Sequence, residues 1–176
     1  MCGTDTLTDK LDSFQGTSGD DTINGLVASD NADSTFQPFD FVDGGAGTDT
    51  FSLRLLNDQA GSTVSSAGRE ASSVENLEVR TIFADGITEG GDVSVASGDF
   101  PDVEAIEVTN LRTDSGDGTD GEVDTLAING LDSEISLTFT ASDGDDHAVN
   151  LAGSPTSEFT FEDASFGDLL ANTTGA

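Results

Sequence analysis

The chain has 176 residues, enough for a single domain, and its apolar fraction of 34% is low for a globular core. It carries 35 acidic residues against five basic ones, so its formal net charge is −30. Such a charge excludes nucleic acids and anionic membranes as partners. No apolar run approaches the ~18 residues of a membrane-spanning helix, so we expect no membrane insertion.

The composition favours an all-β protein. There are 11 Phe and 21 Gly, with no Trp or Tyr. Many short, half-buried strands joined by Gly and Asp turns use such a composition, whereas a helical bundle needs more Leu, Lys and Glu at helical spacing. Cys2 is the single cysteine, so an internal disulfide is excluded. We predict one elongated β domain over residues 1–176.

The N-terminal residues lack the apolar stretch of a cleaved secretory signal. We expect export, if it occurs, to follow a route without an N-terminal signal or to use a signal outside this sequence. Residues 5–16 fit a short helix with Leu7, Leu11 and Phe14 on one side, or a strand that runs into a loop. We favour the strand.

Residues 44–52 match the calcium-binding nonapeptide G-G-x-G-x-D-x-U-x, in which U is a large apolar residue, at every specified position. Residues 16–24 match it except for Thr17 at the second Gly position. Glycines permit a tight loop whose carbonyls turn toward a cation, and Asp49 supplies a hard carboxylate oxygen. In a parallel roll, calcium lies between same-side loops, so two copies are needed. The candidate Ca²⁺ ligands in residues 5–52 are Gly16, Ser18, Asp20, Asp21, Asp43, Gly44, Gly45, Gly47 and Asp49.

The two copies are not in tandem. Asp21 and Asp49 are 28 residues apart, whereas same-side loops of tandem nonapeptides are about 18 apart. About ten residues of segment 25–43 must therefore bulge out, and we expect that segment to be a long exposed loop. Its three phenylalanines either cover one end of the core or form a patch for another subunit; they are Phe36, Phe39 and Phe41.

Apolar residues alternate with polar ones from Phe51 onward. The phrase V-E-x-[LI]-E-V occurs at residues 74–79 and 103–108, 29 residues apart, with a looser version at 123–128. A period of 20 to 29 residues is typical of stacked turns, so we predict a parallel β-helix (β-solenoid) with rungs over 53–161. The residues expected to face inward are Phe51, Leu53, Leu55, Leu77, Val79, Ile106, Val108, Leu126 and Ile128.

An antiparallel β-sandwich is the alternative fold. Residues 127–131 and 135–139 lie close together in sequence and fit a hairpin. Residues 162–176 are expected to form a C-terminal cap or tail, with a short helix over 162–172 that closes the last rung.

Two further acidic segments are candidate calcium loops or solvated turns. The segment that begins at Asp114 lacks the acidic ligand spacing of an EF-hand. The segment that begins at Asp143 is a degenerate nonapeptide copy. Their candidate ligands are Asp114, Asp117 and Asp120, and Asp143, Asp145 and Asp146. His147 is the only histidine, so no zinc set can be assembled. We expect no enzymatic activity.

With these motifs in view, the chain resembles the surface-layer-like and RTX-type proteins that bacteria export by type I secretion. The likeness spans about residues 5–152 and rests on segments 12–25 and 41–51 and on the later repeated phrases. It implies calcium-dependent folding outside the cell and self-assembly into a layer or fibre.

The expected function is that of a calcium-binding, self-assembling structural protein of a bacterial surface layer or extracellular filament. Its partners would be further copies of itself. The alternative is a secreted, calcium-dependent adhesin or carbohydrate-binding module with cell-surface polysaccharide as its ligand. Acidity alone also fits adaptation to a saline habitat.

Overall fold

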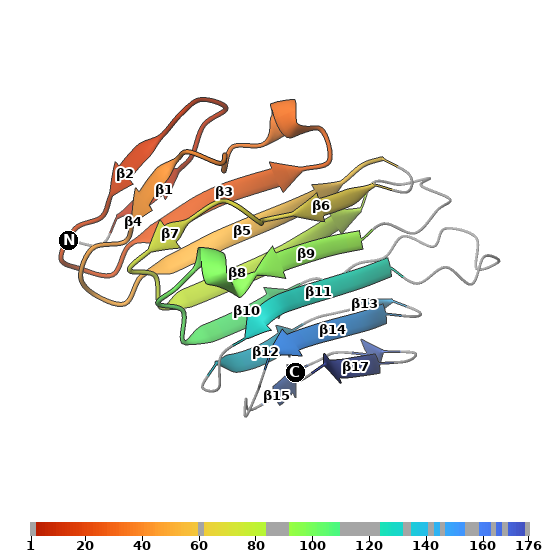
Figure 1. The fold of residues 1–176 in the computed structure, drawn as a ribbon. Coiled ribbons are helices and arrows are strands. Elements are labelled where there is room, and N and C mark those ends of the chain that lie inside the picture. Colours follow the sequence, from red (N-terminus) through yellow and green to blue (C-terminus); the bar gives the residue numbers. More distant parts are fainter. Residues whose placement is uncertain are drawn as a thin grey trace.

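The chain folds as a β-solenoid in which successive turns stack along one axis (Figure 1). The strand pairings are parallel throughout the described residues, and neighbouring turns contribute neighbouring strands. The solenoid prediction is therefore confirmed. The computed structural model describes residues 3–59, 62–83, 92–109, 124–131, 135–140, 143–144, 147–153, 159–162, 165–166 and 169–174.

Sheet A, the longest, has the order β1-β3-β5-β8-β10-β12-β15 within these residues. Its strands are β1 (Thr4–Thr6), β3 (Thr22–Ala28), β5 (Thr50–Asn57), β8 (Asn76–Phe83), β10 (Ala105–Thr109), β12 (Ser136–Thr140) and β15 (Phe159–Glu162).

Sheet C lies across the core from sheet A, and sheet B flanks both near the N-terminal turns (Figure 1). Sheet C contains β6 (Thr63–Ser65), β9 (Asp92–Ala96), β11 (Asp124–Leu131), β14 (His147–Gly153) and β17 (Leu169–Thr174). Sheet B contains β2 (Ser13–Gln15), β4 (Phe41–Asp43) and β7 (Ala71–Ser72). The short β13 (Asp143–Gly144) pairs with β16 (Ser165–Phe166), and two 3₁₀ turns are η1 (Asn31–Asp33) and η2 (Ser97–Asp99).

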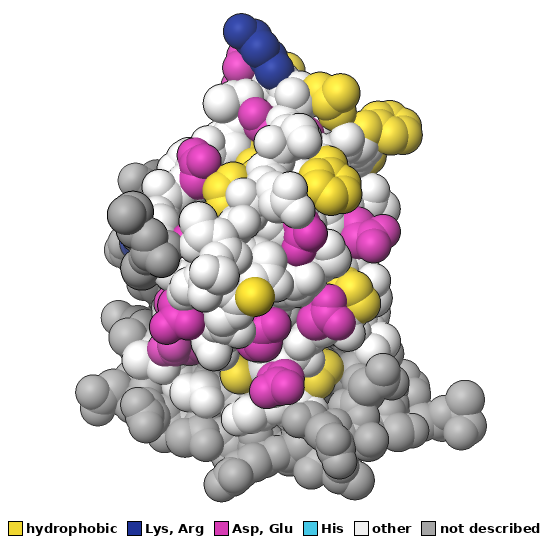
Figure 2. Space-filling view, turned by 90° about the vertical axis from the view of Figure 1, so that its left-hand side faces the viewer, with side chains coloured by type: hydrophobic (Ala, Val, Ile, Leu, Met, Phe, Trp, Pro, Cys, Tyr) yellow, Lys and Arg dark blue, Asp and Glu magenta, His cyan; other side chains and the backbone are white. Residues whose placement is uncertain are grey.

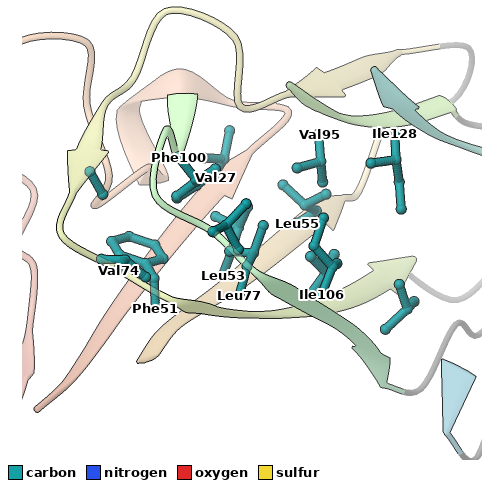
Figure 3. Packing of buried hydrophobic residues seen from close by; sticks show 14 of the residues in the cluster. Val27, Phe51, Leu53, Leu55, Val74, Leu77, Val95, Phe100, Ile106 and Ile128 are labelled. Carbon is teal, nitrogen blue, oxygen red and sulfur yellow. The ribbon is translucent and has the colours of Figure 1, made fainter. Parts of the chain in front are cut away.

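The core is built from alternate residues of each strand, as the period of two predicts. Phe51, Leu53 and Leu55 of β5 are fully buried, and their side chains meet those of the neighbouring turns in one interior (Figure 3). The repeated phrases contribute in register, since Leu77 pairs with Ile106. All nine residues expected to face inward are buried.

Segment 25–43 differs from the expected exposed loop. Residues 25–28 continue β3, and Phe36 is fully buried with its ring centroid 4.7 Å from that of Phe51. Gly25 makes this packing possible, because a Cβ there would lie 2.8 Å from the Phe51 ring. The alternation in β3 is hidden in the sequence because its middle inward position is this glycine.

A buried arginine holds the same segment against sheet C. The Arg69 side chain donates hydrogen bonds to the carbonyl of Phe36 at 2.6 Å, the carbonyl of Ser65 at 2.9 Å and Oδ1 of Asn31 at 3.1 Å. Only 7% of Arg69 is exposed, and burial lowers its pKa from the ordinary value. Its charge is partly compensated by the nearby carboxylates of Asp99 and Asp40.

Two predictions about the C-terminal part are wrong. Residues 127–131 and 135–139 do not form a hairpin, because β11 pairs in sheet C and β12 in sheet A. The closing helix expected over 162–172 is absent from its described residues, which belong to β15, β16 and β17. Parallel ladder bonds to the preceding turn replace a helix too short to be stable alone.

Three large apolar side chains remain exposed near β2 and β4: Leu11, Phe39 and Phe41 are 71%, 91% and 54% exposed. Asp40 fixes this region, since its carboxylate accepts the N–H of Asp12 at 2.9 Å and that of Gln37 at 2.6 Å. No helix in the described part of the chain has the length and apolar character needed to span a membrane.

Candidate metal centre

Two glycine-rich loops and a shorter turn stack where the strands of sheet A begin. We call residues 16–21 the first loop, residues 44–49 the second loop and residues 73–75 the third turn; they precede β3, β5 and β8. The Gly16 N–H donates to the carbonyl of Asp43 at 2.7 Å. The two nonapeptide copies therefore occupy equivalent places in adjacent turns, as a shared site would require.

Acidic side chains link these turns through a ladder of hydrogen bonds. Gly3 N–H donates to Oδ1 of Asp21, Asp21 N–H to Oδ1 of Asp49, and Asp49 N–H to Oε2 of Glu75, each at 2.7 Å. Each carboxylate thus satisfies a main-chain amide one turn nearer the N-terminus. One oxygen of each acid therefore has a structural role, whatever the other oxygen binds.

In the first loop, the second carboxylate oxygen is also satisfied within the chain. Oδ2 of Asp21 accepts the N–H of Thr17 at 2.6 Å and the Thr17 hydroxyl at 2.8 Å. The Thr17 main-chain N–H, followed by its hydroxyl, lowers the pKa of Asp21. The residue that departs from the nonapeptide pattern therefore supplies a donor that a glycine could not.

The second loop lacks these donors. Gly45 replaces Thr17 and has no hydroxyl, and its N–H turns to Oδ1 of Asp43 at 3.1 Å. Oδ2 of Asp49 is buried and has no hydrogen-bond partner, while the whole residue is 0% exposed. An ionised carboxylate in that position costs free energy unless a proton or a cation compensates it.

The electrostatic environment of Asp49 also favours a proton or a cation at its carboxylate. Burial raises the pKa of Asp49 above its ordinary value, and the charges of Glu75, Asp21 and Asp20 raise it further, although the hydrogen bond from Asp21 opposes this. Three other acidic groups therefore act on a carboxylate whose second oxygen has no donor. Such a group binds a proton or a metal cation more readily than an exposed carboxylate.

Only a glycine fits beside this oxygen. A Cβ on Gly44 would lie 2.0 Å from the carbonyl oxygen of Ser73 and 2.8 Å from Oδ2 of Asp49. The main-chain carbonyl of the third turn and the unpartnered carboxylate oxygen therefore approach the same point. Gly45 and Gly47 have φ of +98° and +138°, a region that favours glycine.

This arrangement fits a calcium ion in the chemistry of its donors. Carboxylate and carbonyl oxygens are the ligands that Ca²⁺ prefers, and both occur beside Gly44. No group of three or more His, Cys, Asp or Glu side chains within the described residues is arranged to hold a metal. Main-chain carbonyls would therefore have to supply much of the coordination, as the glycine-rich sequence predicts.

The other predicted ligands lie at varying distances from this point. Asp20 is exposed and accepts the N–H of Thr48 at 2.9 Å with Oδ1, and Ser18 is exposed in the first loop. Figure 2 looks onto this end of the sheet and shows acidic side chains spread over it. Asp143 lies in β13, which pairs with β16 and belongs to a later turn of the solenoid than the two loops. Asp114, Asp117, Asp120, Asp145 and Asp146 lie outside the described residues.

Sequence reasoning missed the contribution of the third turn. Ser73 has a φ of +53° and Glu75 completes the acidic ladder, yet neither belongs to a nonapeptide. The signal was present in the repeated phrase: Glu75 is the residue before β8, as Asp49 is the residue before β5. Comparisons of the chain with models of known families, with curated proteins and with solved structures found no match.

Proposed function

We propose that the protein is a calcium-binding β-solenoid that serves as a self-assembling structural subunit of a bacterial surface layer or extracellular filament. The observation that carries the calcium proposal is the buried, unpartnered Oδ2 of Asp49 beside the carbonyl of Ser73. Export by type I secretion and the absence of enzymatic activity belong to the same proposal, through the resemblance to RTX-type proteins.

Stacked parallel turns suit a structural subunit, because each turn buries its apolar face against the next. A net charge of −30 opposes contact between copies. Divalent cations bound at the acidic end reduce that repulsion locally, and they stabilise only the folded chain that presents the loops. Calcium thus couples folding to assembly.

The test compares the protein with Asp49→Asn, with and without calcium. An asparagine can still accept the N–H of Asp21 and carries no charge, so it needs no cation. In chelator at pH 7, we expect Asp49→Asn to be at least as stable as the parent in urea unfolding. At calcium a hundredfold above its Kd, the parent gains about 2.7 kcal/mol and the variant gains nothing, so their order reverses.

Asp9→Asn is the matched control, since Asp9 is exposed and the chemical change is the same. It should leave the calcium-dependent gain unchanged. Equal gains for Asp49→Asn and the parent would show that calcium does not bind at the second loop. Negative-stain microscopy tests assembly separately: sheets or fibres should form in calcium and dissolve in excess chelator.

A second candidate function rests on the exposed side chains of Leu11, Phe39 and Phe41. Exposed apolar side chains that gather in one patch often mark a binding site. Figure 2 shows apolar side chains gathered near one upper corner of this end. A calcium-dependent adhesin would bind cell-surface polysaccharide there as a monomer. Glycan binding that is lost in Phe39→Ala and retained by monomeric protein would favour this candidate.

A further inference from the structure

The outward face of sheet A carries its side chains in columns, because parallel strands pair in register. Leu26, Arg54 and Arg80 occupy one column, since Arg54 pairs with both of the other positions. Glu78 and Glu107 lie in the next column, two residues earlier along their strands. Arg54, Glu78 and Arg80 are exposed, and Glu107 is partly exposed, so this face is open to solvent.

Like charges are adjacent within each column. Arg54 lies directly opposite Arg80, and Glu78 lies directly opposite Glu107. Neighbouring strands are about 4.8 Å apart, and like charges directly opposite one another destabilise a sheet. Two of the five basic residues of the chain therefore lie directly opposite each other.

The described residues do not neutralise the arginine pair. Neither Arg54 nor Arg80 forms a hydrogen bond or an ion pair in the described part of the chain, in contrast to Arg69, which forms three hydrogen bonds. Glu107 accepts the hydroxyl of Thr140 at 2.9 Å, which leaves its charge available. Each pair thus lacks an opposite charge across from it.

The two pairs are self-complementary. We propose that the outward face of sheet A binds the same face of a second copy about a two-fold axis that runs between the two columns. Such a rotation sets Arg80 of each copy against Glu78 of the other, because both lie in β8, and leaves Arg54 and Glu107 one strand away from the nearest opposite charge. One patch serves both copies, as in an isologous dimer. The inference rests on the self-assembly part of the proposed function and names its surface.

Apolar side chains adjoin the charged columns. Leu56 and Ile82 lie opposite one another in register, in the column beyond the arginines, and both are partly exposed. Covering them removes apolar surface from water, which favours association. The rest of a surface with a net charge of −30 repels a second copy, so charge selects this face over the acidic loop end.

Charge exchange tests the interface. Sedimentation equilibrium in calcium would compare the parent with Arg54→Glu/Arg80→Glu, with Glu78→Arg/Glu107→Arg, and with an equimolar mixture of the two variants. We expect the parent to dimerise, each variant alone to dimerise about tenfold more weakly or worse, and the mixture to recover association, because one variant then presents four acidic groups and the other four basic groups on this face.

The milder variant Arg54→Gln/Arg80→Gln guards against misfolding, since it removes the charge and adds none. Circular dichroism should show the parent strand signal in each variant, and this neutral variant should also dimerise more weakly. A monomeric parent, variants that dimerise as the parent does, or a mixture that fails to associate would overturn the proposal. Repeating the series in chelator separates the interface from the calcium proposal. A charge-dependent dimer that persists in chelator would support the interface and would show that calcium is not needed to form it.

Discussion

The hydroxyl of Thr17 lies 2.8 Å from Oδ2 of Asp21, and no equivalent donor reaches Oδ2 of Asp49. The two aspartates hold the same position in adjacent turns, and Asp21 donates its N–H to Asp49. The main-chain N–H and the hydroxyl of Thr17 therefore satisfy the second oxygen of Asp21 within the chain, whereas that of Asp49 is left for a cation.

The substitution Thr17→Gly should create a second calcium-binding loop. It removes the hydroxyl donor from Asp21 and completes the nonapeptide in the first loop. We expect lower stability in chelator, because a hydrogen bond to a carboxylate is lost, and one additional bound ion per chain in isothermal titration calorimetry. Thr17→Ser keeps a hydroxyl, so its calcium stoichiometry should equal that of the parent; an unchanged count for both would contradict this reading of Thr17.

Gly44→Ala should destabilise the protein by about 1–3 kcal/mol or more, the range for forcing extra atoms into a packed site. The new Cβ would lie 2.0 Å from the carbonyl oxygen of Ser73, and a main-chain atom cannot rotate away. Urea unfolding in calcium and in chelator measures the effect, which should be larger in calcium because the carbonyl is displaced from the candidate site.

Gly98→Ala is the matched control, since a Cβ there would meet nothing within 4 Å. Its stability should stay within about 0.5 kcal/mol of the parent, as for other surface changes. Equal losses in the two variants would show that the contact with Ser73 does not limit the second loop.

The sequence predicted the fold better than it predicted the site. The inward residues of β5, β8 and β10 follow from alternation and from the repeated phrase, because stacked turns bury the same positions in each strand. Strand β3 escaped the pattern, because Gly25 replaces an inward side chain so that Phe36 can pack there. Contacts between segments distant in sequence leave no local periodicity to read.

The candidate site shows the same limit. The nonapeptides predicted the loops that the structure stacks together, yet the unpartnered oxygen of Asp49 depends on which donors adjacent turns supply. Ser73 and Glu75 enter from a turn without a glycine motif. The pairing of β5 with β8 makes them neighbours of the second loop.

In chelator, the contribution of Asp49 to the stability of the fold should decrease as pH rises. Burial, the main cause, raises its folded-state pKa above the ordinary value of 3.8, so the folded chain binds more protons than the unfolded chain above that pH. The stability that Asp49 contributes is therefore fully present below pH 3.8 and is lost as pH rises through its folded-state pKa. The difference in unfolding free energy between the parent and Asp49→Asn isolates this group.

Asp21 should show the opposite slope, because the Thr17 main-chain N–H lowers its pKa. The parent should gain stability over Asp21→Asn as pH rises through the folded-state pKa toward 3.8, and should lose that advantage on acidification. Saturating calcium should abolish the loss at Asp49 and leave the Asp21 profile unchanged. Parallel profiles for the two variants would contradict the difference between the loops.

Phe36 and Phe39 look alike in the sequence, but the structure places them differently. Phe36 is fully buried, and its ring centroid lies 4.7 Å from that of Phe51 and 6.2 Å from that of Phe100, whereas Phe39 is 91% exposed. Phe36→Ala should cost about 3–5 kcal/mol in urea unfolding, the range for removing a buried aromatic ring. Phe39→Ala should cost less than about 0.5 kcal/mol. A loss at Phe39 comparable to that at Phe36 would mean that the exposed ring is buried in the protein as it exists in solution, and sedimentation of both variants would show whether a second copy covers it.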